Sequence, residues 1–410
     1  GAQAPQMPMT RHITLKAPEA VRNMPETVSI GQGLAGSNMR AHMKEVKSRG
    51  NSMSMQRVLT VGVVGLGYWG PNLARNFNQL PGCRLGALCD LDPERLEKMQ
   101  LLYPDPVCYV SFNQMLEEAN LDAVVVAAPV HQHFPLGKAA LLAGKHVLIE
   151  KPLASNSAEC EELIDLADRR GLILMVGHVF VYSSAVRMIR RIIESGDIGD
   201  IRYINSQRLS LGLYHNDINV VWDLAPHDLS MILYLLGRSP QAVNCQGHAN
   251  ITPGIEDVAN VSLSFECGRF ATIQSSWLEP RKVRQMTIVG SRKMIVYDDI
   301  EPFEKIRIYD TRIERPAHYE TFGDFQYTYH YGDSRIPHIE QIEPLRQMCL
   351  HFIDCSLSGV QPLSDGESGL EVVRILEACS ASLMANGKLV SIAASSHDVR
   401  RFSGSMETRI

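Results

Sequence analysis

Short apolar runs alternate with amphipathic stretches along the first half of the chain. The first run, residues 58–64, reads VLTVGVV, a Val-rich pattern that is typical of a strand buried on both faces of a parallel sheet. Further strands are expected at 84–89, 122–127, 146–149 and 171–177, and helices from 71 onward and at 92–103, 134–143 and 156–170. This alternation predicts a doubly wound α/β sheet whose ligands bind beyond the carboxyl ends of its strands.

The pattern changes after residue 200. A strongly apolar helix is predicted to begin near Asp223 and to end at Gly237. Around it lie strand-like runs at 201–209, 258–265, 269–277 and 286–289. A chain of 410 residues is long enough for two or three domains, so this half is expected to form a second one.

Composition excludes several classes of protein. Hydrophobic residues make up 45% of the chain and charged residues 21%, which is normal for a globular protein. The net charge of −5 argues against a dedicated nucleic-acid binder, and no apolar run reaches the ~18 residues that span a bilayer. Nine scattered cysteines without a C-x-x-C pair favour a reducing compartment, so we expect a cytoplasmic protein without disulfides.

Residues 1–55 differ from the rest of the chain. They contain seven Lys or Arg and three Asp or Glu, and they show neither apolar periodicity nor the apolar core of a secretory signal. We interpret them as a flexible N-terminal extension. An arm that wraps a neighbouring subunit and a targeting segment are the alternatives.

A glycine-rich turn follows the first strand directly. Gly65, Gly67 and Gly70 form a G-x-G-x-x-G motif, which suits a tight turn, the approach of a pyrophosphate and close helix–strand packing. Pro71 opens a helix whose N-terminal N–H groups attract phosphates. Asp90, at the end of the second strand, can accept hydrogen bonds from an adenosine ribose and would repel the 2′-phosphate of NADP. The motif therefore predicts NAD as the cofactor.

Lys151 is the first candidate for chemistry. It follows a predicted strand, within Glu150-Lys151-Pro152, at the edge of the sheet where Pro129 and His178 also lie. From its position alone, Lys151 is equally consistent with a surface cation and with a catalytic group beside the nicotinamide.

Asp223 and His227 are the second candidate. They are four residues apart on the predicted apolar helix and so share a face. A carboxylate beside an imidazole fixes its tautomer and raises its basicity. The alternative is a capping Asp near a packed His.

Other histidines give weaker signals. His131 and His133 have no companion ligands at the spacing of a zinc site, so no metal is expected. His133 would contact the cofactor or cap a turn. His178 and Tyr182 follow the last strand of the first half and either edge the substrate pocket or pack in the core.

A basic cluster lies in the strand-like region after residue 277. Arg281, Lys282 and Arg284 would meet a substrate diphosphate or a neighbouring subunit, or form a solvated face. No cysteine has a paired base nearby in the sequence, so no nucleophilic cysteine is expected.

Several of these segments together resemble the Gfo/Idh/MocA dehydrogenases. The matching pieces are the glycine motif with Pro71-Asn72, Ala128-Pro129 followed by His133, the run AGKHVLIEKP at 143–152, and Asp223-x-x-x-His227. The resemblance covers about residues 57–390. One departure is Ala128, where some relatives have a Thr.

The resemblance implies a particular domain organisation. Residues 56–178 would form a Rossmann domain, and 179–390 an α/β domain with an open, mostly antiparallel sheet that carries substrate and oligomer contacts. Residues 391–410 would form a tail. An apolar open face of that sheet would bury against a partner subunit, so a homo-oligomer, a dimer or tetramer, is expected.

The resemblance also implies site residues. Lys151, Asp223 and His227 would converge at the nicotinamide as catalytic groups. The cofactor would contact Gly65, Gly67, Tyr68, Trp69, Gly70, Asp90, Pro129, His133 and Glu150. The substrate would contact His178, Tyr182 and Asn219.

Within the family, the stretches GLGYWGPNLARNF and NDINVVWDLAPHDLS resemble nucleotide-sugar dehydrogenases of the UDP-N-acetylglucosamine 3-dehydrogenase type. This implies hydride transfer between a sugar carbinol carbon and NAD, at C3 of a UDP-N-acetylhexosamine or its uronate. The partner would be a small sugar, with no nucleic acid or membrane. An inositol or free-sugar dehydrogenase, an NAD-dependent glycosidase and an NAD-binding sensor are the alternatives.

Overall fold

A computed structural model describes residues 58–212, 214–314 and 327–392. The predictions for residues 1–55 and for most of the tail at 391–410 lie outside these residues. Within the described residues, no helix is both long and apolar enough to cross a membrane.

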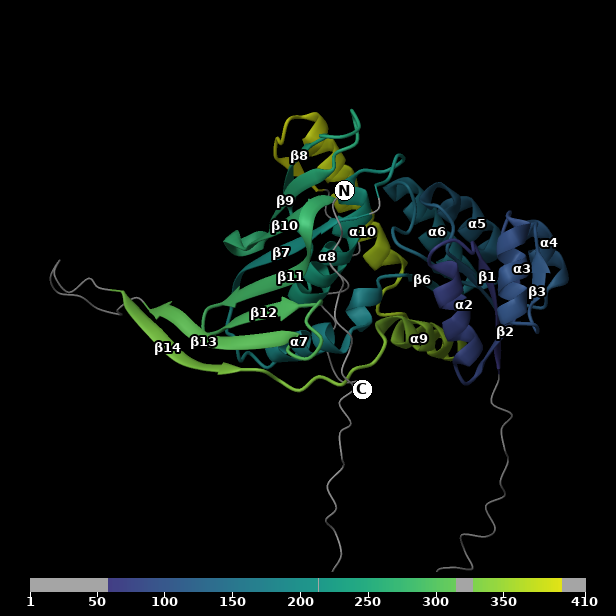
Figure 1. Ribbon diagram of the computed structural model, residues 1–410, viewed down its shortest axis with the longest axis horizontal. Coiled ribbons are helices and arrows are strands. Elements are labelled where there is room, and N and C mark those ends of the chain that lie inside the picture. The colour runs from purple at the N-terminus through teal and green to yellow at the C-terminus, as the bar shows by residue number, and fades with distance from the viewer. Residues whose placement is uncertain (1–57, 213, 315–326, 393–410) are drawn as a thin grey trace, which may run out of the picture. The chain divides into compact units, whose positions relative to one another are not determined.

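The first half forms a parallel six-stranded sheet with the order β3-β2-β1-β4-β5-β6. Its strands are β1 (Leu59–Val64), β2 (Cys83–Cys89), β3 (Val107–Tyr109), β4 (Ala123–Val126), β5 (His146–Ile149) and β6 (Leu174–Val176). Its helices are α2 (Gly70–Gln79), α3 (Pro93–Leu102), α4 (Phe112–Glu118), α5 (Val130–Leu142) and α6 (Ser157–Arg170). The predicted doubly wound Rossmann sheet is confirmed (Figure 1).

Local sequence explains these elements. All six residues of β1 are buried, as a central parallel strand requires. Asp92, Ser111 and Asn156 each accept a hydrogen bond from a backbone N–H of the helix that follows, which satisfies one of its free donors. Gly171 ends α6 in the left-handed conformation, with φ of 62°.

The second half forms a nine-stranded sheet with the order β14-β13-β12-β11-β7-β10-β9-β8-β15. Its strands are β7 (Ile201–Leu211), β8 (Ala242–His248), β9 (Val258–Ser264), β10 (Phe270–Ser276), β11 (Leu278–Gly290), β12 (Met294–Asp298), β13 (Ile306–Glu314), β14 (Thr328–Arg335) and β15 (Val390–Ser391). All pairs are antiparallel except β7 with β10, so the predicted mostly antiparallel sheet is confirmed.

Helices and two short 3-10 turns complete this half. They are η1 (Val179–Tyr182), α7 (Ser184–Glu194), α8 (Val220–Leu236), η2 (Glu266–Gly268), α9 (Pro344–Ser358) and α10 (Gly366–Met384). Apolar residues of α7, α8 and α10 share one core with the nine-stranded sheet, which includes the buried Trp277 and Tyr297. Figure 1 shows β13 and β14 extending beyond the other strands as a two-stranded ribbon.

Helix α9 returns to the core of the Rossmann sheet. Phe352 packs edge-on against Phe77 of α2, with ring centroids 6.2 Å apart, and Met348 and Cys349 are fully buried in the same cluster. The C-terminal segment therefore stabilises the cofactor domain as well as the second sheet.

The other face of the nine-stranded sheet carries both polar and apolar side chains, rather than the uniformly apolar surface that was expected. Asn205 donates a hydrogen bond to Thr272, and Gln207 donates one to Gln274, across β7 and β10. The exposed Tyr203 stacks on its neighbour Phe270. A row of apolar residues also crosses this face, paired in register from β10 to β13: Phe270, Tyr203, Val289, Met294 and Tyr309.

Several elements have different bounds from those predicted. Helix α8 begins at Val220 rather than near Asp223, because Asn219 caps it by accepting a hydrogen bond from the Trp222 N–H. Helix α5 begins at Val130, and β11 covers 278–290 rather than 286–289.

Candidate active site

The glycine motif forms the tight turn between β1 and α2. Gly65 has a φ of +88°, and a Cβ on Gly70 would overlap the Gly65 carbonyl oxygen. A Cβ on Gly67 would meet only the Arg95 guanidinium within 4 Å, so the backbone there is open to a ligand. Each glycine therefore fits the role that the motif predicts.

The N-terminus of α2 has no side-chain cap. Pro71 has no N–H and Asn72 donates its N–H to the Trp69 carbonyl, so the helix dipole and the backbone of the turn, rather than a row of free helix N–H groups, favour a pyrophosphate here. Tyr68 and Trp69 flank this end with 77% and 40% of their surface exposed, and their rings meet edge-on. The residues fit a bound dinucleotide.

Asp90 holds the glycine turn in place. Its carboxylate accepts hydrogen bonds from the backbone N–H of Leu66 at 2.6 Å and of Asp92 at 2.9 Å. A carboxylate has about four acceptor positions, so two remain for a ribose diol. Arg95, which the sequence did not single out, lies 3.6 Å from this carboxylate and is half exposed.

Lys151 follows β5 and reaches the first turn of α8. Its Nζ donates a hydrogen bond to the carbonyl oxygen of Asp223 at 2.8 Å and lies 3.5 Å from the Asp223 carboxylate. Its side chain is 13% exposed. The peptide bond to Pro152 is cis. The ammonium from the Rossmann sheet therefore meets the helix that carries His227.

Asp223 does not hold His227 as predicted. Across the described part of the chain, no hydrogen bond or ion pair joins these two side chains. Instead the Asp223 carboxylate accepts a hydrogen bond from Trp277 Nε1 at 3.1 Å, and His215 Nε2 lies 3.9 Å away. The short Asp side chain is drawn toward Lys151 and Trp277, away from the next turn of the helix.

His227 is a neutral imidazole in an electropositive setting. Burial lowers its pKa well below the usual value, and the charges of Lys151, Arg208 and Arg284 lower it further. Its Nδ1 is buried without a hydrogen-bond partner among the described residues. Phe180 packs edge-on against the ring at 5.1 Å. An unprotonated imidazole can accept a proton at neutral pH.

Two buried titratable groups lie beside Lys151. Burial raises the pKa of Glu150 to about 7, and its carboxylate accepts a long 3.3 Å hydrogen bond from the Lys151 N–H. Burial, with Lys151, lowers the pKa of His178 to about 4. The His178 ring is 2% exposed, and neither of its nitrogens bonds a described residue.

Two predicted contact residues have structural roles instead. His133 is 1% exposed, and its ring nitrogens face the carbonyl oxygens of Pro152 at 2.7 Å and Ala128 at 2.8 Å, so the ring is closed to a cofactor. Tyr182 is 1% exposed and bonds Ser364 at 2.9 Å, which places it in the core rather than in a substrate pocket.

Asn219 and Pro129 lie at helix starts. Asn219 caps α8, and Pro129 precedes α5. A hollow of about 430 Å³ lies between these helix starts, and its lining includes Asn219, Trp222 and His131. A small ligand could thus contact Asn219 one turn from Asp223.

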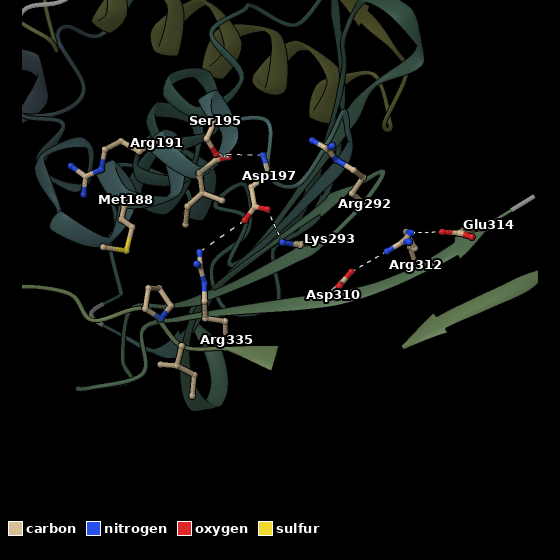
Figure 2. Close-up of a pocket in the computed structure, with 13 residues that line it drawn as sticks. Met188, Arg191, Ser195, Asp197, Arg292, Lys293, Asp310, Arg312, Glu314 and Arg335 are labelled. Carbon is tan, nitrogen blue, oxygen red and sulfur yellow. Dashed lines mark hydrogen bonds and ion pairs between the residues drawn. The ribbon is translucent and has the colours of Figure 1, made fainter. Parts of the chain in front are cut away.

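A larger groove of about 1230 Å³ lies elsewhere, between α7, the residues just before β12, and the strands β13 and β14 (Figure 2). Figure 2 shows Lys293 and Arg335 directed at Asp197 from two sides. None of Lys151, Asp223 and His227 lines this groove, so it is separate from the candidate site.

Comparison with known proteins gives the family. Residues 59–178 match "Oxidoreductase family, NAD-binding Rossmann fold", and residues 186–296 match "GFO/IDH/MocA C-terminal domain". The chain belongs to the Gfo/Idh/MocA oxidoreductases. It is therefore an oxidoreductase with an NAD-binding domain.

Individual relatives in the family differ in their activities. UDP-N-acetylglucosamine 3-dehydrogenase of Acidithiobacillus ferrooxidans is 29% identical over 233 residues, 56% of this chain and 71% of that protein. Myo-inositol 2-dehydrogenase of Thermotoga maritima is 26% identical over 346 residues, 79% of this chain and 96% of that protein. A solved structure of the Acidithiobacillus enzyme has a TM-score of 0.67 at 24% identity and covers 80% of this chain and 98% of its own.

The NAD-binding Rossmann domain thus carries the cofactor site, and residues far apart in the sequence surround Asp223 and His227. Sequence reasoning missed Trp277, His215 and Phe180, which contact Asp223 or His227. Trp277 stands next to the basic cluster that the sequence did single out. Within the described ranges, no group of three His, Cys, Asp or Glu side chains is placed to hold a metal ion.

Proposed function

We propose that the protein is an NAD-dependent sugar dehydrogenase that oxidises a secondary alcohol, at C3 of a UDP-N-acetylhexosamine or its uronate. The observation that carries this proposal is the meeting of Lys151 with the helix of His227, beside a glycine turn built for a dinucleotide. An ammonium and a neutral imidazole at one site are the groups that alcohol oxidation needs.

The residues divide the work as follows. His227 accepts the proton of the substrate hydroxyl, since its lowered pKa keeps it unprotonated. Lys151 donates a hydrogen bond to the same oxygen and stabilises the negative charge that develops on it. The hydride leaves the carbinol carbon for NAD, which supplies the redox chemistry. The products are a ketone, NADH and a protonated His227, which returns its proton to water.

Asp223 acts as a positioning residue in this scheme. Its backbone carbonyl and its carboxylate both contact the Lys151 ammonium, and Trp277 fixes the carboxylate. This arrangement restricts Nζ to the N-terminal turn of α8. The predicted catalytic set is kept, with Asp223 acting on Lys151 rather than on His227.

The sugar is inferred from similarity. The Acidithiobacillus relative named above as a UDP-N-acetylglucosamine 3-dehydrogenase supports a nucleotide sugar. The Thermotoga inositol dehydrogenase aligns with a larger share of the chain, so oxidation of a cyclitol is the second candidate. In this scheme Lys151, Asp223 and His227 would serve the oxidation of either substrate.

A screen of UDP- and dTDP-sugars and of myo-inositol, with NAD and with NADP, tests the proposal through the absorbance of the reduced cofactor. We expect NADH with a UDP-sugar, and none when His227 is replaced by Ala. NADH only from inositol would support the second candidate. Turnover of a glycoside without net NADH would instead indicate a glycosidase that recycles its cofactor.

We also infer a homo-oligomer, as the family resemblance implies. A dimer formed through the open face of the nine-stranded sheet would bury the exposed Tyr203 and Phe270, which stack on each other in neighbouring strands. Sedimentation velocity over a concentration series measures the oligomeric state, and we expect a species larger than the monomer. A monomer at every concentration would contradict the inference.

A further inference from the structure

The hollow of about 430 Å³ at the start of α8 lies beside the site of Lys151. Trp222 in its wall directly precedes Asp223, the residue that contacts the Lys151 ammonium. His215 stands between the two places, because its Nε2 lies 3.9 Å from the Asp223 carboxylate and its Nδ1 lies 4.0 Å from the Asp217 carboxylate, which lines the hollow. A ring whose reacting carbon is held at Lys151 can therefore extend into this hollow.

Two polar residues of the wall are already used by the fold. Asn219 accepts a hydrogen bond from the Trp222 N–H with its Oδ1, and its Nδ2 donates one to Glu256 at 2.8 Å. The indole N–H of Trp222 donates to the Ser380 hydroxyl at 2.9 Å. Half of the hydrogen-bonding capacity of the Asn219 amide is thus committed to holding the start of the helix, so recognition of a ligand needs other residues.

Three other polar side chains line the hollow and are free to bind a ligand. The Asp217 carboxylate, the His131 ring and the Ser155 hydroxyl are exposed and make no hydrogen bond to a described residue. They come from three separate segments, namely the loop before α8, the first turn of α5 and the loop after β5. Water satisfies these groups until a ligand with matching polar atoms replaces it.

The remaining surface of the hollow is mostly apolar. It is supplied by Val130, Ile218, Ile255 and Trp222, and there is no Lys or Arg among the described residues that line it. A carboxylate accepts hydrogen bonds but repels an anion, and no cation in the lining offsets that repulsion. Apolar surface beside a carboxylate, a hydroxyl and an imidazole therefore matches an uncharged ring that carries both C–H and hydroxyl groups.

We propose that Asp217, together with His131 and Ser155, binds the hydroxyl groups of the substrate ring that do not react, and so determines which hydroxylated ring the enzyme accepts. The two oxygens of the Asp217 carboxylate can each accept a hydrogen bond from a hydroxyl group, and the other two side chains can donate or accept. Lys151 and His227 act on the reacting hydroxyl instead. Phosphates of a nucleotide sugar lie outside the hollow, away from the Asp217 charge.

This inference rests on the proposed function, and turnover and binding test the two separately. For turnover, kcat and KM of Asp217→Ala would be measured with NAD and with UDP-N-acetylglucosamine or myo-inositol. We expect KM for the oxidised compound to rise at least tenfold while kcat stays within threefold, because the carboxylate binds the ring but takes no part in proton transfer. A KM near that of the wild type, or a fall in kcat alone, would overturn the inference.

For binding, the same two compounds and analogues that lack one hydroxyl group would be titrated into the enzyme–NADH complex, with NADH fluorescence as the readout. We expect at least one deoxy analogue to bind the wild type at least tenfold more weakly than its parent, and to bind Asp217→Ala as well as its parent does. A purely structural role of Asp217 would weaken parent and analogue alike and leave their ratio unchanged, which would contradict the proposal. If neither compound is oxidised, the proposed function fails, and this experiment still decides the role of Asp217.

Two variants control for misfolding and misassignment. Asp105→Ala removes an exposed aspartate that precedes β3, at the edge of the Rossmann sheet opposite to the ligands, and it should leave KM unchanged. Ser155→Leu places apolar volume in the hollow and removes a hydroxyl, so it should raise KM at an unchanged melting temperature and NADH affinity. A normal KM in Ser155→Leu would show that no part of the substrate occupies the hollow.

Discussion

Replacing Lys151 by Met removes one ammonium from the site and keeps the length of the side chain. In the structure that ammonium makes a 2.8 Å hydrogen bond to the Asp223 carbonyl and lies 3.5 Å from its carboxylate, and its side chain is 13% exposed. Loss of a donor that stabilises an oxyanion reduces kcat by about 10²–10³-fold, or ~3–4 kcal/mol. We expect that loss in Lys151→Met, with NADH affinity unchanged.

The same substitution changes the pH dependence in a defined direction. Among charged groups, Lys151 is the largest cause of the low pKa of His227. His227 must be unprotonated to accept a proton, so the wild-type kcat/KM should remain high below pH 6.5. Without the positive charge, the pKa of His227 rises, and the acid limb of the profile should move to higher pH.

Steady-state rates of NADH formation between pH 5 and 9 measure both effects. Lys138→Met is a matched control, because Lys138 pairs with Glu162 on the Rossmann helices and does not contact the site. A rate within tenfold of wild type would refute the role assigned to Lys151. An acid limb that does not move would show that the charge of Lys151 does not affect the pKa of His227.

Three further substitutions test the neutral state of His178, the glycine turn and the contact of Asp90 with the cofactor. His178→Phe should raise the melting temperature more at pH 5 than at pH 8. The pKa of His178 is about 4 in the folded protein and near 6.5 in the unfolded chain, so the stability of the wild type falls as the pH drops between these values. Equal shifts of the melting temperature at both pH values would contradict the burial of a neutral ring. Gly70→Ala should reduce NADH affinity at least 100-fold by calorimetry, because the new Cβ would overlap the Gly65 carbonyl; near-normal binding would exclude a rigid turn. Asp90→Asn should reduce the ratio of the NADP dissociation constant to the NAD dissociation constant at least tenfold. An unchanged ratio would show that Asp90 does not contact the ribose.

The Rossmann half could be predicted because its signals are local. Val-rich runs such as 58–64, the glycine turn and the capping residues Asp92 and Asn156 each specify their own element. The position of Lys151 at a strand end followed from the same reasoning. What the sequence could not show is that α9, some 260 residues after α2, packs back onto it. An amphipathic helix requires a core but does not specify which one.

The site was harder to predict because its contacts depend on side-chain direction. The spacing of Asp223 and His227 correctly put both on one helix, yet Asp223 turns toward Lys151 and Trp277. His133 had the sequence context of a cofactor ligand, but both of its nitrogens face backbone carbonyls.

The proposed reaction passes a hydride from a sugar carbon to NAD at the site of Lys151 and His227. The most direct test supplies UDP-N-acetylglucosamine and its uronate with deuterium at C3 and analyses the reduced cofactor by mass spectrometry. We expect NADH that carries the deuterium, with a primary isotope effect on the rate of the chemical step. Deuterium that stays on the sugar, or is lost to water while NADH contains only hydrogen, would contradict it.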